Sequence, residues 1–171
     1  MKDFLELEIR RNIYDVIAKN PGLHLSQIAR MLDTRVSLIE YHLSFLEKSE
    51  IITVLKVGYS RYYLKNQMGR KDGEILSQLR QEIPLRIVLF LLNNPNSRHK
   101  EILKNVDVSK STLSYHLNKL VKHGLIISQN HIDEKGYTIL NKKEITDLLI
   151  RYKPYNVMES FKDIWGDLQV D

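Results

Sequence analysis

The sequence predicts a mainly α-helical chain with small β-hairpins, an α+β fold, in which one unit occurs twice and a helical extension follows. The first observation is that residues 13–52 align with residues 87–126 without a gap, at a constant offset of 74 positions, and that 12 of the 40 aligned positions are identical. The second is that each copy carries three stretches with apolar residues at helical spacing, followed by a short β-branched stretch. The third is that helical patterns continue after the second copy without a third repeat. Two copies indicate tandem domains, because a solenoid needs more repeats.

The first copy predicts three helices. Leu5, Ile9, Ile13 and Val16 recur at spacings of three and four, and the helix they predict ends at residues 20–22, Asn-Pro-Gly. The second helix is expected around residues 26–32, and residues 33–35 form the turn after it. The third helix is expected at about residues 36–48, and its buried face consists of Ile39, Leu43 and Leu46.

A β-hairpin is expected after these helices. Residues 51–57 are β-branched and apolar, residues 61–64 form the second strand, and Gly58 supplies the turn. Three helices followed by a hairpin are typical of a winged helix, in which the hairpin is the wing and the third helix is the recognition helix.

The second copy predicts the same unit after a linker. Residues 66–74 contain two glycines and mixed charges, and a helix from about Ile75 is expected to bend or restart at Pro84. The three helices of this copy are expected at residues 85–93, at residues 100–106 and after Ser109, whose hydroxyl can cap the third helix. Strands at residues 126–130 and 137–140, flanking residues 133–136, form the second wing.

Four segments are therefore expected. They are a first winged-helix domain at residues 1–68, a linker or linker helix at 69–84, a second winged-helix domain at 85–141 and a C-terminal helical extension at 142–171. The extension has apolar stripes before and after Pro154, which must be buried on their own domain or against another chain. We expect a homodimer whose contacts are Leu148, Leu149, Phe161, Ile164, Trp165 and Leu168.

Composition limits the chemistry of the chain. It has no cysteine, which excludes disulfides and cysteine-based metal centres and fits a reducing cytoplasm. The histidines show no metal-ligand spacing, and no glycine-rich phosphate loop, GxSxG or HExxH motif occurs, so we expect no enzyme, no metal and no cofactor. No apolar run is long enough to span a membrane, and the N-terminus does not read as a signal peptide.

Charge favours a polyanionic partner. The formal net charge is +5, and residues 70–141 alone carry +4. In the third helix of the second copy, Leu113, Leu117, Leu120 and Val121 face the core at about 100° per residue. Small, polar and basic side chains lie opposite, so this helix can enter a major groove. The candidate DNA-binding residues of this copy are Lys100, Ser109, Lys110, Ser111, Thr112, Ser114, Tyr115, Asn118, Lys119, Lys122 and Lys135.

The third helix of the first copy departs from this pattern. Arg35 stands where the second copy has the cap Ser109, Glu40 stands for Ser114, and Phe45 stands for Lys119. Residues 34–50 carry a net charge of −1, whereas residues 108–124 carry +3, so the second copy is expected to be the stronger DNA anchor. The first copy either reads DNA more weakly or serves domain contacts. Its candidate DNA-binding residues are Arg35, Ser37, Tyr41 and Ser44 on the helix and Lys56, Tyr59 and Arg61 on the wing.

Each recognition helix contains an adjacent tyrosine and histidine. Tyr41 and Tyr115 are expected to point outward, toward phosphates or bases. His42 and His116 lie at the edge of the buried face, where we expect hydrogen-bonded structural histidines.

The segment SKSTLSYHLNKLVKHGLI at 109–126 and its twin at 34–52 resemble winged-helix transcriptional regulators of the ArsR and MarR type. They look most like archaeal regulators that have tandem winged helices and a C-terminal helical extension; here LLIRYKP and a Trp-containing helix occupy the extension. The resemblance covers about residues 5–65 and 85–140, and it implies binding of double-stranded DNA as a dimer. The cysteine metal boxes of metal-sensing relatives are missing, so metal sensing is not implied.

A second interpretation stays open. Tandem winged helices also serve as protein–protein scaffolds, as in chromosome-segregation and condensation protein B, and as basal factors resembling the TFIIE family. The acidic third helix of the first copy fits such a role, including contact with the transcription machinery.

Overall fold

The computed structural model describes residues 7–130 and 135–153 of the chain. Their contacts divide the chain into two compact units, residues 1–77 (unit 1) and residues 78–171 (unit 2), and each is described by itself. Leu5 and the predicted dimer contacts Phe161, Ile164, Trp165 and Leu168 lie outside the described residues.

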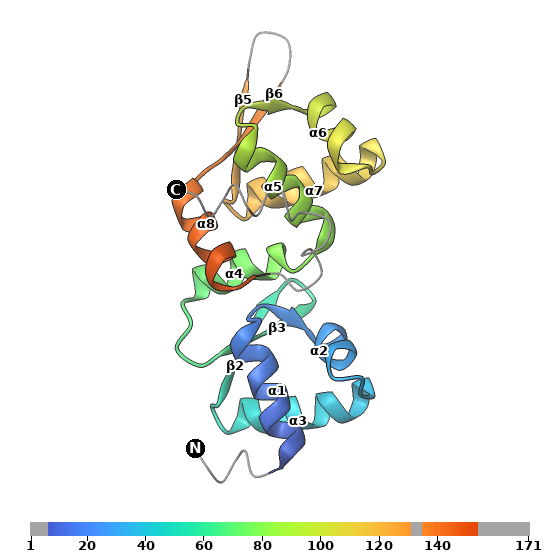
Figure 1. Cartoon of the computed structure of the whole chain (residues 1–171), viewed down its shortest axis with the longest axis vertical. Helices are drawn as coiled ribbons and strands as arrows, with labels where there is room; N and C mark the ends of the chain where they lie inside the picture. The colour runs from blue at the N-terminus through green and yellow to red at the C-terminus, as the bar shows by residue number, and fades with distance from the viewer. Residues whose placement is uncertain (1–6, 131–134, 154–171) are drawn as a thin grey trace. The chain divides into compact units, whose positions relative to one another are not determined.

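Unit 1 consists, in its described part, of three helices, a small sheet and a helix that follows the sheet (Figure 1). The strands form an antiparallel sheet in the order β1-β3-β2. Gly58, with φ of 60°, and Tyr59 make a two-residue turn between β2 and β3. The elements are α1 (Glu8–Lys19), β1 (Leu23–His24), α2 (Leu25–Met31), α3 (Val36–Lys48), β2 (Ile52–Val57), β3 (Ser60–Lys65) and α4 (Arg70–Leu79), whose last two residues belong to unit 2.

Unit 2 repeats this order of elements. Its antiparallel sheet has the order β4-β6-β5. The elements are α5 (Glu82–Asn93), β4 (Ser97–Arg98), α6 (His99–Val106), α7 (Lys110–Lys122), β5 (Ile126–Asn130), β6 (Lys135–Ile139) and α8 (Lys142–Arg151). The predicted fold class, mainly α with hairpin wings in two tandem winged helices, is confirmed.

The two units share strand register at the offset of 74. Leu23 pairs with Tyr63 in unit 1, and Ser97 pairs with Tyr137 at the same positions of unit 2. Residues with positive φ also coincide: Gly22 with Asn96, Asp33 with Asp107, and Glu50 with Gly124. Asp33 and Asp107 form the turn before each recognition helix, where a short polar side chain tolerates the left-handed conformation.

The cores coincide as well. In each unit the inner faces of three helices supply side chains that are at most 1% exposed. In unit 1 these are Ile13, Ile17, Ile28, Ile39, Leu43 and Leu46, and in unit 2 the same positions hold Ile87, Leu91, Ile102, Leu113, Leu117 and Leu120. This shared core holds each recognition helix in the same place within its unit.

Gly22 marks a close approach between backbones in unit 1. Its φ is 86°, and a Cβ atom built on it would lie 2.9 Å from both the carbonyl carbon of Leu76 and the amide nitrogen of Ser77 in α4. Only glycine fits at this position, because it adopts positive φ at no steric cost and leaves room for the helix.

Several expectations about the connecting segments differ from the structure. Helix α4 begins at Arg70 rather than at Ile75, and it occupies most of the segment expected as a linker. A new helix does begin close to Pro84, as one of the two expected alternatives had it: α4 ends at Leu79, and Pro84 lies in the first turn of α5, where early N–H groups have no partner within a helix. Strands β1 and β4 were not expected, because two residues are too few to show a periodic pattern.

The C-terminal extension differs from expectation as well. Helix α8 follows the second wing as α4 follows the first, so it completes the repeated unit instead of standing apart from it. Leu148 and Leu149 are 5% and 1% exposed. Both side chains are thus buried within this chain, and their contact with a second chain stays a prediction.

Three smaller predictions are also corrected. Val121, expected in the core, is 36% exposed, and Lys135, expected at the wing turn, belongs to strand β6. In α1, Ile17 is fully buried together with Ile13, whereas Val16, expected on the same face, is half-buried. None of the helices in the described ranges is both long and apolar enough to cross a membrane.

Candidate nucleic-acid interface

The start of the recognition helix α7 is fixed by Ser109. Its hydroxyl accepts a hydrogen bond from the backbone N–H of Thr112 at 3.1 Å, and it lies 2.7 Å from the Thr112 hydroxyl and 3.0 Å from that of Ser111. The predicted cap is confirmed. Ser109 and Thr112 thus shape the helix terminus, and their hydroxyls are already engaged there.

The outer face of α7 is exposed and basic. Tyr115 is 61% exposed, and Lys110, Ser111, Asn118 and Lys122 are exposed with it. The first turn contains no acid and the last turn contains Lys122. These five side chains form one polar surface that bears two positive charges, which suits contact with phosphates and base edges.

Two other predicted contacts in unit 2 lie on elements other than α7. Lys100 is exposed on α6, and Lys135 is exposed on β6 of the wing.

Lys119 is a predicted contact that lies at the flank of α7 rather than on its exposed face. It is half-buried, and its Nζ donates a hydrogen bond to Oε1 of Gln81 at 3.3 Å. Burial lowers the pKa of the Lys119 ammonium. This lysine therefore belongs to the flank of α7 and is held away from the exposed face.

The flank also contains His116. Burial, and then the charge of Lys119, lower the pKa of His116. Its Nδ1 is buried and has no hydrogen-bond partner among the described residues. The prediction of a hydrogen-bonded histidine is wrong at this nitrogen.

Ser114 is tied to a residue absent from the predicted set. Its Oγ lies 3.0 Å from Nε2 of His99 and donates to the carbonyl of Lys110 at 2.9 Å. His99 begins helix α6, and a lone histidine at a helix start gives no sequence signal of this contact.

In unit 1, helix α3 lacks the cap. No side chain accepts a hydrogen bond from the N–H groups at the start of this helix. The sequence predicted this, because Arg35 stands where the second copy has the cap Ser109. Arg35, Ser37 and Tyr41 are exposed, Tyr41 by 64%, and Ser44 is half-buried.

The first wing offers fewer free charges than predicted. Lys56 is exposed, and Tyr59 at the turn is fully exposed. Arg61 donates to Oε2 of Glu47 at 2.6 Å, so its charge is already paired on the surface.

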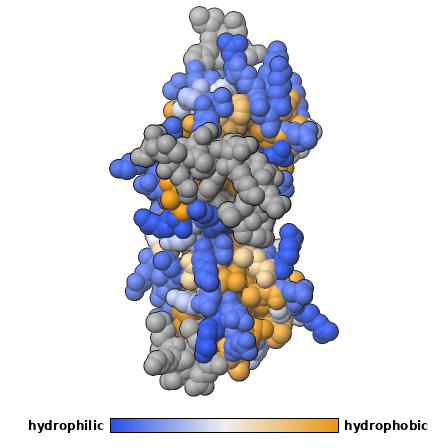
Figure 2. All heavy atoms as spheres, viewed as in Figure 1, coloured by the Kyte–Doolittle hydropathy of each residue, from blue (hydrophilic) through white to orange (hydrophobic). Residues whose placement is uncertain are grey.

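The exposed side of α3 is more apolar than that of α7. Val36 is 48% exposed and Leu38 is 43% exposed, where α7 has Lys110 and Thr112. Figure 2 shows hydrophobic residues at the surface of unit 1. Arg10 of α1 packs on another side of α3. Its guanidinium stacks 3.6 Å from the centre of the Phe45 ring. Its Nε donates a hydrogen bond to Nδ1 of His42 at 3.4 Å.

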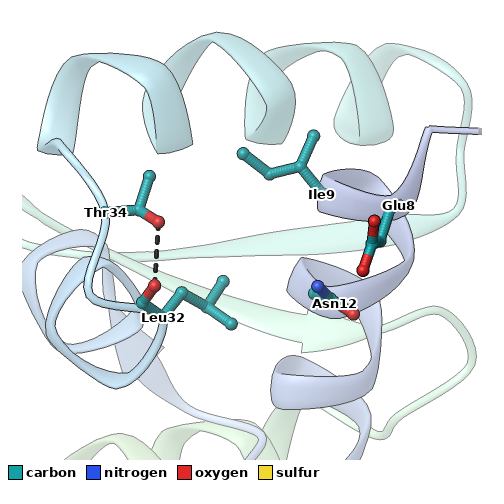
Figure 3. Close-up of a pocket in the computed structure, with 5 residues that line it drawn as sticks. All are labelled: Glu8, Ile9, Asn12, Leu32 and Thr34. Carbon is teal, nitrogen blue, oxygen red and sulfur yellow. Dashed lines mark hydrogen bonds between the residues drawn. The ribbon is translucent and has the colours of Figure 1, made fainter.

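A shallow pocket of about 240 Å³ lies at the start of α3 (Figure 3). Glu8, Ile9 and Asn12 of α1 line it together with Leu32 and Thr34 from the turn between α2 and α3. The Thr34 hydroxyl donates to the Leu32 carbonyl at 2.8 Å. Across the described ranges, no group of three or more His, Asp or Glu side chains is placed to hold a metal ion.

Both units match known families. Residues 82–128 match the model described as "Bacterial regulatory protein, arsR family", and residues 6–53 match the one described as "Winged helix-turn-helix DNA-binding". A protein of Methanocaldococcus jannaschii described as an uncharacterized HTH-type transcriptional regulator is 33% identical over 132 residues. That match covers 77% of this chain and 33% of the relative, so the chain spans about a third of its relative's length.

Two solved structures are similar to part of the chain. HlyU from Vibrio cholerae has a TM-score of 0.44 and 24% identity, covering 50% of this chain and 92% of that one. The transcriptional repressor BigR from Xylella fastidiosa has a TM-score of 0.43 and 20% identity, covering 52% of this chain and 97% of that one.

Proposed function

The chain is a tandem winged helix-turn-helix protein, and on that premise we propose that it is a transcriptional regulator that binds double-stranded DNA in a sequence-specific way. The observation that carries the proposal is the exposed outer face of α7, with Lys110 and Lys122 at its two ends and Ser111, Tyr115 and Asn118 between them. A helix with such a face fits a major groove, where lysines bind phosphates and the amide and hydroxyls reach base edges. The wing carries Lys135 toward the backbone.

Unit 2 is the main DNA anchor in this proposal. Its recognition segment carries +3, whereas that of unit 1 carries −1. In unit 1 the wing charge of Arg61 is paired with Glu47. Phosphate contacts supply most of the affinity, so unit 1 contributes less.

The repeat supplies a matched test of this asymmetry. Lys122 and Lys48 occupy the same position of α7 and α3, and both are exposed. We would measure fluorescence anisotropy of the full chain with genomic and random duplexes over a salt series. Lys122→Ala should weaken binding and reduce the salt slope by about 1, while Lys48→Ala should change both less.

Absence of duplex binding at low salt, or binding that salt does not weaken, would refute DNA binding through this face. Selection of bound fragments from genomic DNA then tests sequence specificity, and equal recovery of all fragments would refute it.

The proposal includes a homodimer in the cytoplasm. The apolar spacing of Phe161, Ile164, Trp165 and Leu168 supports a dimer contact in the C-terminal segment, and the lack of cysteine fits a reducing compartment. Sedimentation of the full chain at micromolar concentration tests the dimer. A monomer, or a dimer that Ile164→Asp leaves intact, would contradict this assignment.

A second function is favoured for unit 1 by the exposed Val36, Leu38 and Tyr41. Exposed apolar side chains on a recognition helix suit a protein contact better than a phosphate backbone. If unit 1 acts as a scaffold module, Leu38→Ser should leave duplex affinity unchanged while Tyr115→Ser weakens it. Equal losses would place both helices on DNA.

A further inference from the structure

The side chains at the start of α6 and α7 form a small polar cluster in unit 2. Ser114 Oγ has one hydrogen, which it donates to the carbonyl of Lys110 at 2.9 Å. At the 3.0 Å contact with His99, Nε2 is therefore the donor and Ser114 the acceptor. The imidazole thus keeps Nδ1 as the nitrogen that can take up a proton.

The same three positions differ in unit 1. At the offset of 74, His99 corresponds to Leu25, Lys110 to Val36 and Ser114 to Glu40. The backbone plan is shared, so the difference lies in the side chains alone. The polar and basic cluster exists only in the copy whose recognition segment carries +3.

We propose that His99, Lys110 and Ser114 form a binding site for one phosphate group of the DNA backbone, at which DNA binding is coupled to uptake of a proton by His99. Lys110, which is exposed, contacts the phosphate. Ser114 orients the imidazole, and the imidazolium adds a second positive charge beside Lys110. This inference rests on the proposed function and adds His99 to its contacts.

The electrostatics of the free protein disfavour the protonated form of His99. Burial lowers its pKa, and the positive charge of Lys110 lowers it further. Helix α6 packs against α5, α7, β4 and β6. The charged and titratable groups on those elements are Glu82 and Arg86, which pair with each other, and Lys110, Tyr115, His116, Lys119, Lys122, Arg98, Lys135 and Tyr137. Of these, Lys110 is the group whose charge acts on the pKa of His99.

A phosphate bound at this site has the opposite effect on the pKa of His99. Its negative charge favours the imidazolium, so the pKa of His99 is higher in the complex than in the free protein. Between those two pKa values the complex holds one more proton than the free components. Affinity for DNA therefore rises as pH falls through that range, by at most about tenfold per pH unit for one proton.

The first experiment follows the His99 imidazole by NMR in the full chain, free and saturated with a duplex that it binds. His99→Gln identifies the resonance. We expect the titration midpoint of His99 to move to higher pH in the complex. An unchanged or lower midpoint in a chain that binds the duplex would overturn the inference.

The second experiment measures duplex affinity between about pH 5.5 and about pH 8, across the usual range of histidine titration. The wild type should bind at least about threefold more tightly at the acidic end than His99→Gln does. His123→Gln, at the far end of α7, is the control and should keep the wild-type profile. A His99→Gln profile that matches the wild type would also overturn the inference.

Inorganic phosphate distinguishes a site for the DNA backbone from a site for the free phosphate ion. It also distinguishes failure of the His99 site from failure of DNA binding as such. Saturation of the free chain with phosphate should raise the His99 midpoint less than the duplex does. A full shift with phosphate alone would contradict a site for DNA backbone. If no duplex binds at any pH, the proposed function fails, and a phosphate titration that leaves the His99 midpoint unmoved then refutes the site as well.

Discussion

Gln81 and Lys119 are joined by a hydrogen bond from the lysine Nζ to the glutamine Oε1, at 3.3 Å. At the equivalent positions of unit 1 the chain has Leu7 and Phe45, so the pair is specific to the second unit. The bond holds a basic side chain of α7 at the flank of the helix rather than on its exposed face.

Lys110→Ala and Lys119→Ala should therefore differ in their effect on DNA binding. We expect Lys110→Ala to weaken affinity several-fold at low salt and to reduce the salt slope by about 1, because it removes one phosphate contact. Lys119→Ala should change affinity by less than about twofold, since a lysine that lacks a phosphate contact contributes little beyond its share of the protein's overall electrostatic field. Anisotropy titrations over a salt series measure both, and equal effects would show that Lys119 swings onto the DNA.

Gly22→Ala should destabilise unit 1 by about 2–4 kcal/mol, because it adds a clash with the α4 backbone to the cost of positive φ. Gly58→Ala is the matched control. Gly58 also has positive φ, but a Cβ atom at this position would meet nothing within 4 Å, so the substitution should cost only about 1 kcal/mol. Urea unfolding followed by circular dichroism gives both values. Equal costs would mean that α4 moves to make room.

The helix caps offer a pair of opposite predictions. Ser109→Ala should lower the free energy of unfolding by about 1 kcal/mol, because the N–H of Thr112 loses its partner. Arg35→Ser should raise it by about 0.5–1 kcal/mol, since α3 has no side-chain cap at that position. Urea midpoints of the two variants against the wild type would reveal either a gain or a loss, and a loss with Arg35→Ser would contradict the prediction.

The buried histidines should make stability depend on pH. Burial lowers the pKa of both His42 and His116, with added effects from Arg10 and Lys119 respectively. In the unfolded chain each titrates near its ordinary value of about 6.5, so below that pH the unfolded state binds more protons. Stability should be full above about pH 7.5 and should fall as pH drops toward about 5. Urea unfolding at a series of pH values measures the loss.

Substituting each histidine in turn distinguishes their contributions to stability and to its pH dependence. His116→Phe should reduce the acid-side loss and should not destabilise the protein at pH 7.5, because it removes a buried nitrogen without a partner. His42→Phe should reduce the acid-side loss too, but at a cost in stability, since Arg10 Nε loses its acceptor. A destabilised His116→Phe with unchanged pH dependence would contradict this account.

The repeat made much of the fold predictable from sequence. The helix bounds of α3 and the Gly58 turn follow from apolar spacing and from glycine's access to positive φ, both of which are local properties. Strand β1 could not be predicted, because its two residues owe their conformation to pairing with Tyr62 and Tyr63, about 40 positions further along. The course of α4 was obscured by Gly69 and Gly73, which weaken a helical pattern although tertiary packing holds the helix.

The candidate site was predictable in outline. Helical geometry placed Tyr115, Asn118 and Lys122 on the exposed face, because that face depends on the angle per residue alone. It did not reveal that Arg61 is paired with Glu47, or that His99 touches Ser114, since these contacts join separate elements. Contacts of this kind require the tertiary arrangement of the unit.

The common register of the two sheets allows side chains to be exchanged between equivalent positions of the two units by mutation. Adding or subtracting 74 converts a position in the first three helices or in the paired strands of one unit into its structural equivalent in the other. Leu25→His, Val36→Lys and Glu40→Ser would thus graft the His99 cluster onto α2 and α3 without redesign of the backbone. One unit can therefore serve as the donor and the other as the acceptor of these three side chains.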